Sequence, residues 1–366
     1  MEKAKISASQ LFILMALFEL GSAILLSIGG EAKQDAWIAI LLAMVSSFLL
    51  FLVFHRLYCY YPHLLPTEYM QKIMGNLIGK VFAFLYIVYF TYEAARILRD
   101  FGEMLLTFAY PETPLFIANA LLIFVIVYTT RKGIEVIARS GELLFVLMYI
   151  LATMGFILVV CSGLIDFTNL KPVLEEGLWS VTKVAIIHTL YFPFAEVMVF
   201  TMIFPYLKDP KKVKVTGLCA LGLSGINLAI TMIINVSVLG LDLTSRSLFP
   251  LLTTIQSIQV ADFLERLDVF FMIALIINGF FKIIIYFYAA VIGSANLFRI
   301  KFSFKLSAPL GMVVLFVSMI VASNIQEHIY EGKKGLLISI HLCFQIIIPL
   351  LLLIVAFLKN KKRAGI

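Results

Sequence analysis

The sequence predicts an all-α integral membrane protein in which ten transmembrane helices form a 5+5 inverted repeat. The first observation is composition: 62% of the 366 residues are hydrophobic, 14% are charged, and the mean hydropathy is +1.02. A soluble domain could not bury that much apolar surface. The other observations are a series of bilayer-length apolar runs and polar interruptions in the first and sixth runs. Residues 1–366 are therefore expected to form a single integral membrane domain.

Apolar stretches of about 20 residues are long enough to cross a bilayer. By this criterion the spans are expected at residues 8–30, 35–55, 77–102, 115–130, 140–163, 180–206, 213–240, 264–296, 306–323 and 336–358. The first run lacks an Ala-x-Ala cleavage site, so we expect it to be a retained span. Three segments are too short or too polar to cross and are expected to be interfacial or loop helices: 65–75, 132–139 and 249–260.

Basic residues between these spans are distributed unequally between the two sides. One side carries eighteen of them: Lys3, Lys5, Arg56, Lys72, Arg131, Lys132, Arg139, Lys208, Lys211, Lys212, Lys214, Arg299, Lys301, Lys305, Lys359, Lys361, Lys362 and Arg363. The other side carries six: Lys33, Lys171, Arg246, Arg266, Lys333 and Lys334. Because cytoplasmic loops are enriched in lysine and arginine, this bias predicts an even number of spans with both termini in the cytoplasm.

Each half of five spans begins with an interrupted helix. Gly21-Ser22 interrupts span 1, and Tyr191-Phe192-Pro193-Phe194 interrupts span 6. Since five is odd, the two halves must have opposite orientations. Paired broken helices in inverted halves indicate a leucine-transporter-like fold with a binding site at the membrane midplane, whereas either break alone is equally well explained as a packing residue or a kink.

Several ionisable side chains lie at mid-depth in these spans. They are Glu19 in span 1, Glu196 in span 6 and Lys282 in span 8, with Glu93 and Tyr92 near the middle of span 3. A charge at the bilayer centre costs about 2.5 to 3.5 kcal/mol on insertion scales, so charges at one depth should face each other or water. We expect a polar site enclosed by spans 1, 3, 6 and 8, with Glu19, Glu93 and Lys282 as its charge network.

The two breaks supply backbone groups that suit a zwitterion such as an amino acid. Unwinding at Gly21-Ser22 is expected to free the amides of Ser22, Ala23 and Ile24 for a carboxylate. Unwinding before Pro193 is expected to free the carbonyls of His188, Leu190 and Tyr191 for an ammonium group. The candidate ligand-binding residues are Gly21, Ser22, Ala23, Tyr92, Tyr191, Phe192 and Glu196.

Some of these side chains have alternative interpretations. Lys282 is either a binding-site cation or a structural counter-ion to Glu19 or Glu196, and the second is favoured because an unpaired central lysine would tend to lose its proton. His188 is expected to be a packing histidine rather than a ligand contact. Glu93, Arg96 and Asp100 have helical pair spacing and are expected to form a local salt-bridge ladder, and Arg139 could pair with Glu142.

Several other functions find no support in the sequence. The four cysteines stand singly, without the spacing of a disulfide framework or a metal site. No Gly-x-Ser-x-Gly, His-Glu-x-x-His or phosphate-binding loop is present, so we expect no cofactor, no metal and no enzymatic activity. Basic residues scattered between apolar runs do not indicate a nucleic-acid partner.

Five local strings give the chain a specific resemblance. They are KISASQL at 5–11, RKGIEVIAR at 131–139, TNLKPVLEEG at 168–177, FPFAE at 192–196 and FLERLD at 263–268. Together and in this order they resemble the spore germination permease family, the B subunits of nutrient germinant receptors, within the amino acid-polyamine-organocation superfamily. The resemblance extends from about residue 5 to residue 360. One departure is the short Gly21-Ser22 break, where many carriers of the superfamily have a longer glycine-rich one.

The resemblance implies a physiological role that the residues alone do not give. It implies a subunit in the spore inner membrane that senses a small germinant, most simply an amino acid, and acts with an A subunit and a lipoprotein C subunit to trigger germination. The alternatives are a proton-coupled amino acid permease, or a structural scaffold in which Glu19, Glu196 and Lys282 are packing groups.

Overall fold

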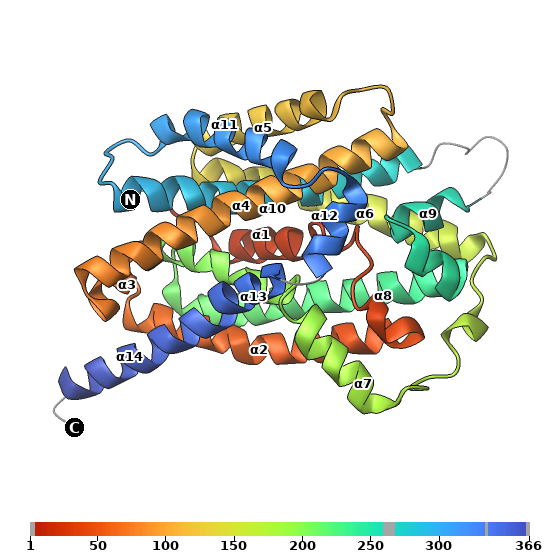
Figure 1. Cartoon of the computed structure of the whole chain (residues 1–366), viewed down its shortest axis with the longest axis horizontal. Coiled ribbons are helices and arrows are strands. Elements are labelled where there is room, and N and C mark those ends of the chain that lie inside the picture. Colours follow the sequence, from red (N-terminus) through yellow and green to blue (C-terminus); the bar gives the residue numbers. More distant parts are fainter. Residues whose placement is uncertain (1–3, 259–267, 334–335, 364–366) are drawn as a thin grey trace.

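The computed structural model describes residues 4–258, 268–333 and 336–363, and these residues are almost entirely helical. In the view of Figure 1 most of the long helices extend lengthwise across the molecule, and α14 runs obliquely to them. They are α2 (Ala36–Tyr60), α4 (Asn76–Phe108), α5 (Leu115–Arg131), α6 (Ile134–Cys161), α8 (Val213–Arg246), α10 (Asp268–Leu297), α11 (Phe304–Ile320) and α14 (Ile348–Arg363). Shorter elements are α1 (Ala8–Leu20), α3 (Pro66–Met74), α7 (Gly177–Val184), α9 (Pro250–Gln256), α12 (Ile325–Lys333) and α13 (Leu336–Leu342).

Equivalent elements of the two halves pack against each other. Helix α2 contacts α8, α4 contacts α10 and α5 contacts α11, which are the second, third and fourth members of each half. The first members also meet, because α1 contacts the 3₁₀ segment Phe194–Met202. This pairing is what an internal inverted repeat would produce. Both ends of the described chain lie at the same end of the bundle, which Figure 1 shows on the left.

Helix α10 occupies the centre of the bundle. It packs against α4, α6, α1 and α5, and its middle turns are almost completely buried. The sequence explains this position, since α10 is apolar on all sides apart from a small number of polar residues, a pattern typical of a core helix rather than a lipid-facing one. Lys282 lies on this central helix and is fully buried.

The number of spans stays a prediction. Within the described residues, seven helices are long and apolar enough to cross a membrane, or up to eight if α11 and α12, bent by 100° at their junction, count as one. Two further apolar helices are shorter, namely α1 and α5. Span 1 was expected at 8–30, yet α1 ends at Leu20 and no regular α-helix follows until α2.

The three segments that were expected not to cross the membrane agree with the structure to different extents. Helix α3 matches the segment 65–75, and Pro66 lies in its first turn as the missing amide of proline favours. The expectation of a separate helix at 132–139 is wrong, because α6 begins at Ile134 and continues through the span without interruption. Helix α9 covers part of 249–260, with Pro250 in its first turn, and the last two residues of that segment lie outside the described ones. The start of span 8 and most of the string at 263–268 also lie outside them.

Candidate functional site

The first helix is interrupted at Gly21. Helix α1 begins with a capping box, in which the Ser7 side chain accepts from the amide of Gln10, and it ends where Gly21 adopts a non-helical conformation. The amide of Ile24 donates to the Leu20 carbonyl at 2.9 Å, so this one of the three amides expected to be free is occupied. Among the described residues no partner is recorded for the amides of Ser22 and Ala23 or for the buried Ser22 hydroxyl. These groups are available as donors at the break.

The second interruption lies where the sequence indicated it. Helix α7 passes into a π-helical turn at Ala185–Thr189, the chain turns through residues 190–193, and a 3₁₀ helix follows at Phe194–Met202. The Leu190 carbonyl accepts from the amide of Ala195 at 2.9 Å and is therefore not free as expected. In the described part of the chain, no backbone amide is recorded as donating to the carbonyls of His188 and Tyr191. These two carbonyls remain as acceptors for a ligand.

Lys282 joins the two interruptions. Its ammonium group donates to the Glu196 carboxylate, and both side chains are buried. The same ammonium lies 4.7 Å from the centre of the Phe192 ring and 5.3 Å from that of the Phe18 ring. Of the two counter-ions considered for Lys282, the structure thus pairs it with Glu196. The two carboxylate oxygens of Glu19 are buried without a hydrogen-bond partner among the described residues.

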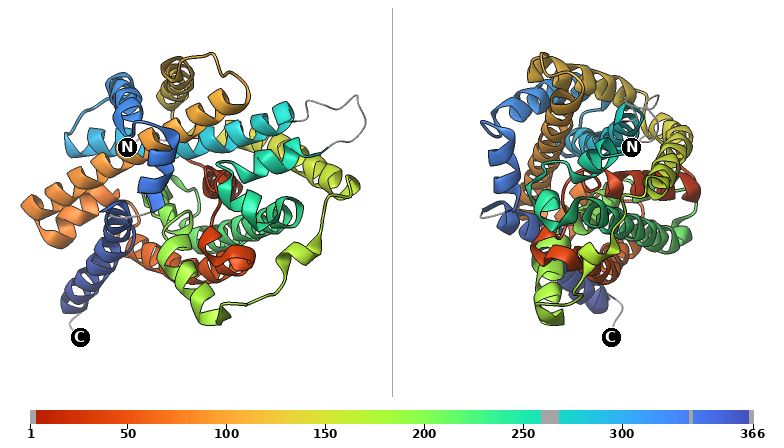
Figure 2. Two further views of the ribbon diagram at one scale, coloured as in Figure 1. Left: turned by 45° about the vertical axis from the view of Figure 1, so that its right-hand side comes forward. Right: turned by 90° about the vertical axis from the view of Figure 1, so that its right-hand side faces the viewer.

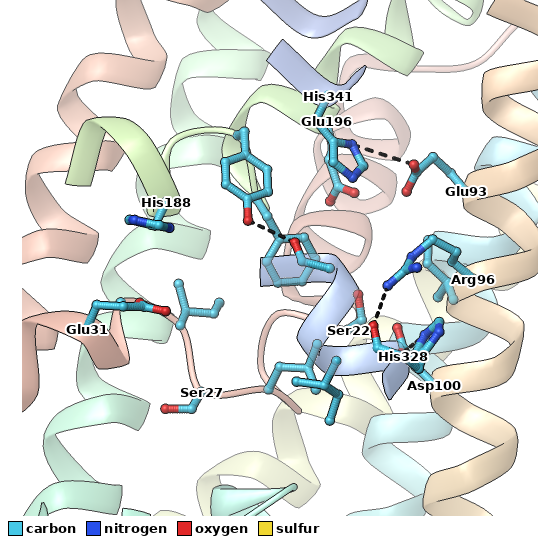
Figure 3. A pocket seen from close by; sticks show the side chains of 18 residues that line it. Ser22, Ser27, Glu31, Glu93, Arg96, Asp100, His188, Glu196, His328 and His341 are labelled. Carbon is cyan, nitrogen blue, oxygen red and sulfur yellow. Dashed lines mark hydrogen bonds and ion pairs between the residues drawn. The ribbon is translucent and has the colours of Figure 1, made fainter. Parts of the chain in front are cut away.

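A small cavity of about 100 Å³ lies between the two interruptions, α4 and α12. Because a water molecule takes up about 30 Å³ of liquid, such a cavity suits a solute with few heavy atoms. Its polar lining is rich in carboxylates: Glu31, Glu93, Asp100 and Glu196, against Arg96 and three histidines. Figure 3 shows His341, Glu196 and Glu93 close together, and His188 and Glu31 on the side away from α4.

Helix α12 forms one wall of the cavity and is held there by contacts with α4 and with the second interruption. Arg96 donates from Nη2 to the His328 carbonyl at 2.9 Å, and His328 Nε2 lies 2.9 Å from an Asp100 oxygen (Figure 3). The Tyr191 hydroxyl donates to the Gly332 carbonyl at 3.1 Å. The salt-bridge ladder expected along α4 is therefore wrong, since Arg96 and Asp100 have α12 as their hydrogen-bond partner instead of each other. The pairing of Arg139 with Glu142 is also wrong, because Arg139 pairs with Glu135.

A buried polar chain leads away from the cavity toward α14. The nearest Glu93 oxygen is 3.6 Å from His341 Nδ1, which is too long for a hydrogen bond. His341 Nδ1 lies 2.9 Å from the Tyr89 hydroxyl, and Gln345 donates to that hydroxyl at 2.9 Å. The His341 ring also stacks on Tyr191, with ring centres 5.5 Å apart. Glu93 consequently keeps an oxygen with no hydrogen bond from the described residues, at the wall of the cavity.

The candidate residues divide into two groups by position. Those that line the cavity are Ser22, Glu93, Tyr191, Phe192 and Glu196. Those that do not are Gly21, Ala23, Tyr92, Glu19 and Lys282. Ala23 instead faces α8 in a separate space of about 10 Å³, and the Tyr92 hydroxyl accepts from Arg96 at 3.4 Å.

Sequence reasoning missed several lining residues. Helix α12, with His328 and Gly332, lies in what was expected to be a loop between spans 9 and 10, because it is short and polar. His341 stands within span 10 and could have been found as an intramembrane ionisable residue. His188, expected to be a packing residue, lines the cavity, as do Ser27 and Glu31 just beyond the first interruption.

Comparison with known proteins identifies relatives along most of the chain. Residues 5–326 match the family model described as Spore germination protein. The chain is 52% identical to spore germination protein KB of Bacillus subtilis (strain 168) over 99% of this chain and 97% of that protein. It is 25% identical to spore germination protein YndE of the same organism, over 98% of each.

Solved structures share the fold at low sequence identity. The complex of MhsT with L-phenylalanine superimposes with a TM-score of 0.67 at 16% identity, covering 97% of this chain and 89% of that one. Mhp1, a nucleobase-cation-symport-1 family transporter, gives a TM-score of 0.64 at 14% identity, covering 93% and 75%. A Na⁺-coupled sialic acid symporter gives 0.64 at 12% identity, covering 93% and 79%. The leucine-transporter-like fold predicted from the sequence is thereby confirmed, and the chain is an integral membrane protein.

Proposed function

The chain belongs to the spore germination protein family, and we propose that it is the membrane subunit of a spore germinant receptor that binds a small amino acid between its two interrupted helices. The germinant changes the equilibrium between two states of the bundle, and partner subunits detect that change. Our proposal includes the spore inner membrane as the location, both termini in the cytoplasm, and receptor A and C subunits as partners. It assigns the chain binding and signalling, with no catalytic step.

The observation that carries the proposal is that the cavity offers both hydrogen-bond donors and hydrogen-bond acceptors that have no partner among the described residues. The Ser22 amide and hydroxyl are donors that suit a carboxylate. The carbonyls of His188 and Tyr191, together with the Glu93 carboxylate, are acceptors that suit an ammonium group. The excess of carboxylates in the lining favours a ligand that carries a positive charge.

The size of the cavity restricts the amino acid. At about 100 Å³ the cavity suits a small side chain rather than an aromatic one. The Phe192 ring lies at its wall, where it would contact an apolar side chain. We therefore expect small aliphatic amino acids to be the effective germinants.

The proposal is tested by the nutrient response of spores that carry a Ser22→Leu variant. We expect the response to a panel of amino acids, sugars and nucleosides to be abolished, because leucine fills the donor side of the cavity, while the amount of protein in the membrane is unchanged. Ser46→Leu is the matched control, since Ser46 is half-buried in α2 and its hydroxyl bonds, among the described residues, only the Leu42 carbonyl of its own helix. An unchanged dose response in Ser22→Leu would exclude this site. Loss of partner-subunit levels in both variants would indicate a scaffold.

A proton-coupled amino acid permease is the second candidate, favoured by the fold shared with transporters. Reconstitution in liposomes with labelled amino acids separates the two functions. Saturable binding without uptake supports the receptor, and saturable uptake that increases with an imposed proton gradient supports the permease. A response to sugars alone would contradict the amino acid ligand and leave the receptor role standing.

A further inference from the structure

A second cavity, of about 700 Å³, opens at the end of the bundle that holds both chain ends. Most of its lining residues come from α3, the start of α4, the connection between α5 and α6, and the connection between α10 and α11. Figures 1 and 2 show α3 and the connection between α10 and α11 at the same end of the molecule. Lys80 on α4 lines this cavity, and Arg96, sixteen residues further along the same helix, lines the first one. At 1.5 Å per residue the two cavities are roughly 24 Å apart along α4.

The lining of the second cavity is strongly basic. Five cationic side chains line it: Lys80, Arg131, Lys132, Arg299 and Lys301. Between residues 4 and 363, with the undescribed residues set aside, none of the five forms a salt bridge. Like charges gathered without a counter-ion repel one another, so such a cluster attracts an anion.

Among the described residues the lining holds one carboxylate, Glu68, which offsets a single positive charge. Glu68 accepts from the amide of Leu65 at 3.2 Å, which caps α3, and from the Asn296 side chain at 2.9 Å. One Glu68 oxygen thus caps α3, and the other holds α3 against α10. Five cations against one carboxylate leave the cavity with a formal excess of four positive charges.

Two backbone positions with positive φ shape this cavity. Gly133 has φ +87°, which glycine adopts without steric cost, and the turn it makes between α5 and α6 holds Arg131 and Lys132 at the rim. Arg299 has φ +57°, a conformation that non-glycine residues rarely adopt, just beyond the end of α10. An arginine is thus present in the sequence where the backbone favours glycine.

The rim of the cavity has the character of a membrane interface. Phe298, Phe302 and Phe304 are about half exposed, and the ammonium groups of Lys301 and Lys305 lie 5.7 and 5.4 Å from the centre of the Phe302 ring. Aromatic and basic side chains together are typical of the depth at which lipid headgroups lie. From this rim an exposed apolar stripe runs along α4 at helical spacing, through Leu77, Val81, Phe84 and Val88.

We propose that this cavity binds the phosphate headgroup of an anionic phospholipid, whose acyl chains lie along the exposed stripe of α4. Basic pockets between transmembrane helices recognise such headgroups by charge. A free phosphate ion would contact the five cations alone, whereas a phospholipid would contact both the cations and the apolar stripe. An acidic peptide segment has no acyl chains that would pack against the stripe. The site is independent of the germinant cavity, and its test does not depend on the nutrient response.

The test measures phospholipid retained by the full chain purified in detergent, using native mass spectrometry and thermal unfolding. The probes are phosphatidylglycerol, phosphatidylcholine with the same acyl chains, and inorganic phosphate. We expect phosphatidylglycerol to bind in preference to phosphatidylcholine and to raise the unfolding temperature. In the variant Arg131→Gln/Lys132→Gln/Arg299→Gln we expect its affinity to fall by about a hundredfold, since each basic group near the surface contributes attraction.

The matched control is Lys208→Gln/Lys211→Gln/Lys212→Gln, which removes three exposed cations that do not line this cavity. We expect this variant to bind phosphatidylglycerol as the unmodified chain does. If the triple variant of the cavity fails to fold, the single variants Lys132→Gln and Lys301→Gln, both at exposed positions, are each expected to weaken binding about fivefold.

Three outcomes would overturn the proposal. One is equal retention of phosphatidylglycerol by the cavity variants and the control. Another is equal retention of phosphatidylcholine and phosphatidylglycerol by the unmodified chain. The third is stabilisation by inorganic phosphate alone at the concentration at which phosphatidylglycerol acts, which would identify a free anion as the ligand.

Discussion

Lys282 crosses the interruption of the first helix so closely that a Cβ atom on Gly21 would lie 2.3 Å from the Lys282 Cδ atom. The same Cβ would lie 2.7 Å from the Phe18 carbonyl oxygen. Atoms that are not bonded do not approach to these distances, so only glycine fits here. Gly21 therefore interrupts α1 and also admits the lysine that pairs with Glu196 on the other interrupted helix.

The first prediction concerns this close approach. We expect Gly21→Ala to lower the free energy of unfolding by about 1–3 kcal/mol, because the added methyl group forces Lys282 or the Phe18 carbonyl to move in a packed core. Thermal unfolding of the purified chain measures it. Gly222→Ala is the control, since the nearest atom to its Cβ would be Phe48 Cζ at an ordinary 3.7 Å. Equal stability of the two variants would mean that Lys282 does not occupy this position.

The second prediction concerns the buried ion pair. We expect Lys282→Met and Glu196→Gln each to cost about 3–5 kcal/mol, because each leaves the partner charge buried without a counter-ion. The double variant should recover much of this loss, since no unpaired charge remains. A double-mutant cycle from thermal unfolding gives the coupling energy. Additive costs in the double variant would show that the two side chains do not interact.

Sequence patterns were sufficient to predict the arrangement of the fold and the positions of the two helix interruptions. Gly21-Ser22 and Pro193 can be recognised in the sequence as polar or helix-breaking residues inside apolar runs. Glu196 and Lys282 can be recognised because a charged side chain at mid-depth in a membrane is costly and therefore rare. The pairing of these two charges was one of two alternatives. Choosing between Glu19 and Glu196 requires the rotation of α10 about its axis, which side-chain packing determines.

The wall formed by α12 could not be predicted in the same way. Helix α12 is short and polar, so hydropathy places it in a loop, and its position over the cavity depends on the bend of 100° after α11. Arg96 and Asp100 have the spacing of a ladder within α4, which is all that local sequence can indicate. Their contacts with His328 lie more than 220 residues away in the chain.

The third prediction distinguishes Glu19 from Glu196. The Glu19 oxygens accept no hydrogen bond from the described residues. Replacing the carboxyl group with an amide of the same shape therefore breaks no hydrogen bond to them. We expect Glu19→Gln to lower the free energy of unfolding by less than about 1 kcal/mol, in contrast to Glu196→Gln, because the substitution removes no ion pair and no hydrogen bond. Thermal unfolding of the two variants side by side measures the difference. A loss in Glu19→Gln as large as that in Glu196→Gln would show that Glu19 carries an essential charge.

The fourth prediction concerns the contacts that hold α12 at the wall of the cavity. Tyr191→Phe removes the hydrogen bond to Gly332, and Asp100→Asn weakens the contact with His328. Because one such hydrogen bond contributes about 0.5–1.5 kcal/mol, we expect either variant to increase about two- to tenfold the population of molecules in which α12 has moved away from the cavity.

The measurement is the rate at which a water-soluble thiol reagent labels Ser22→Cys, a fully buried position at the cavity wall, in a chain whose four native cysteines are replaced by serine. Asp242→Asn is the control, because Asp242 is exposed on α8 and does not line the cavity. We expect faster labelling in Tyr191→Phe and Asp100→Asn and an unchanged rate in Asp242→Asn. The same labelling rate in all variants would show that these contacts do not hold α12 against the cavity, since weakening a contact that does so must expose the thiol more often.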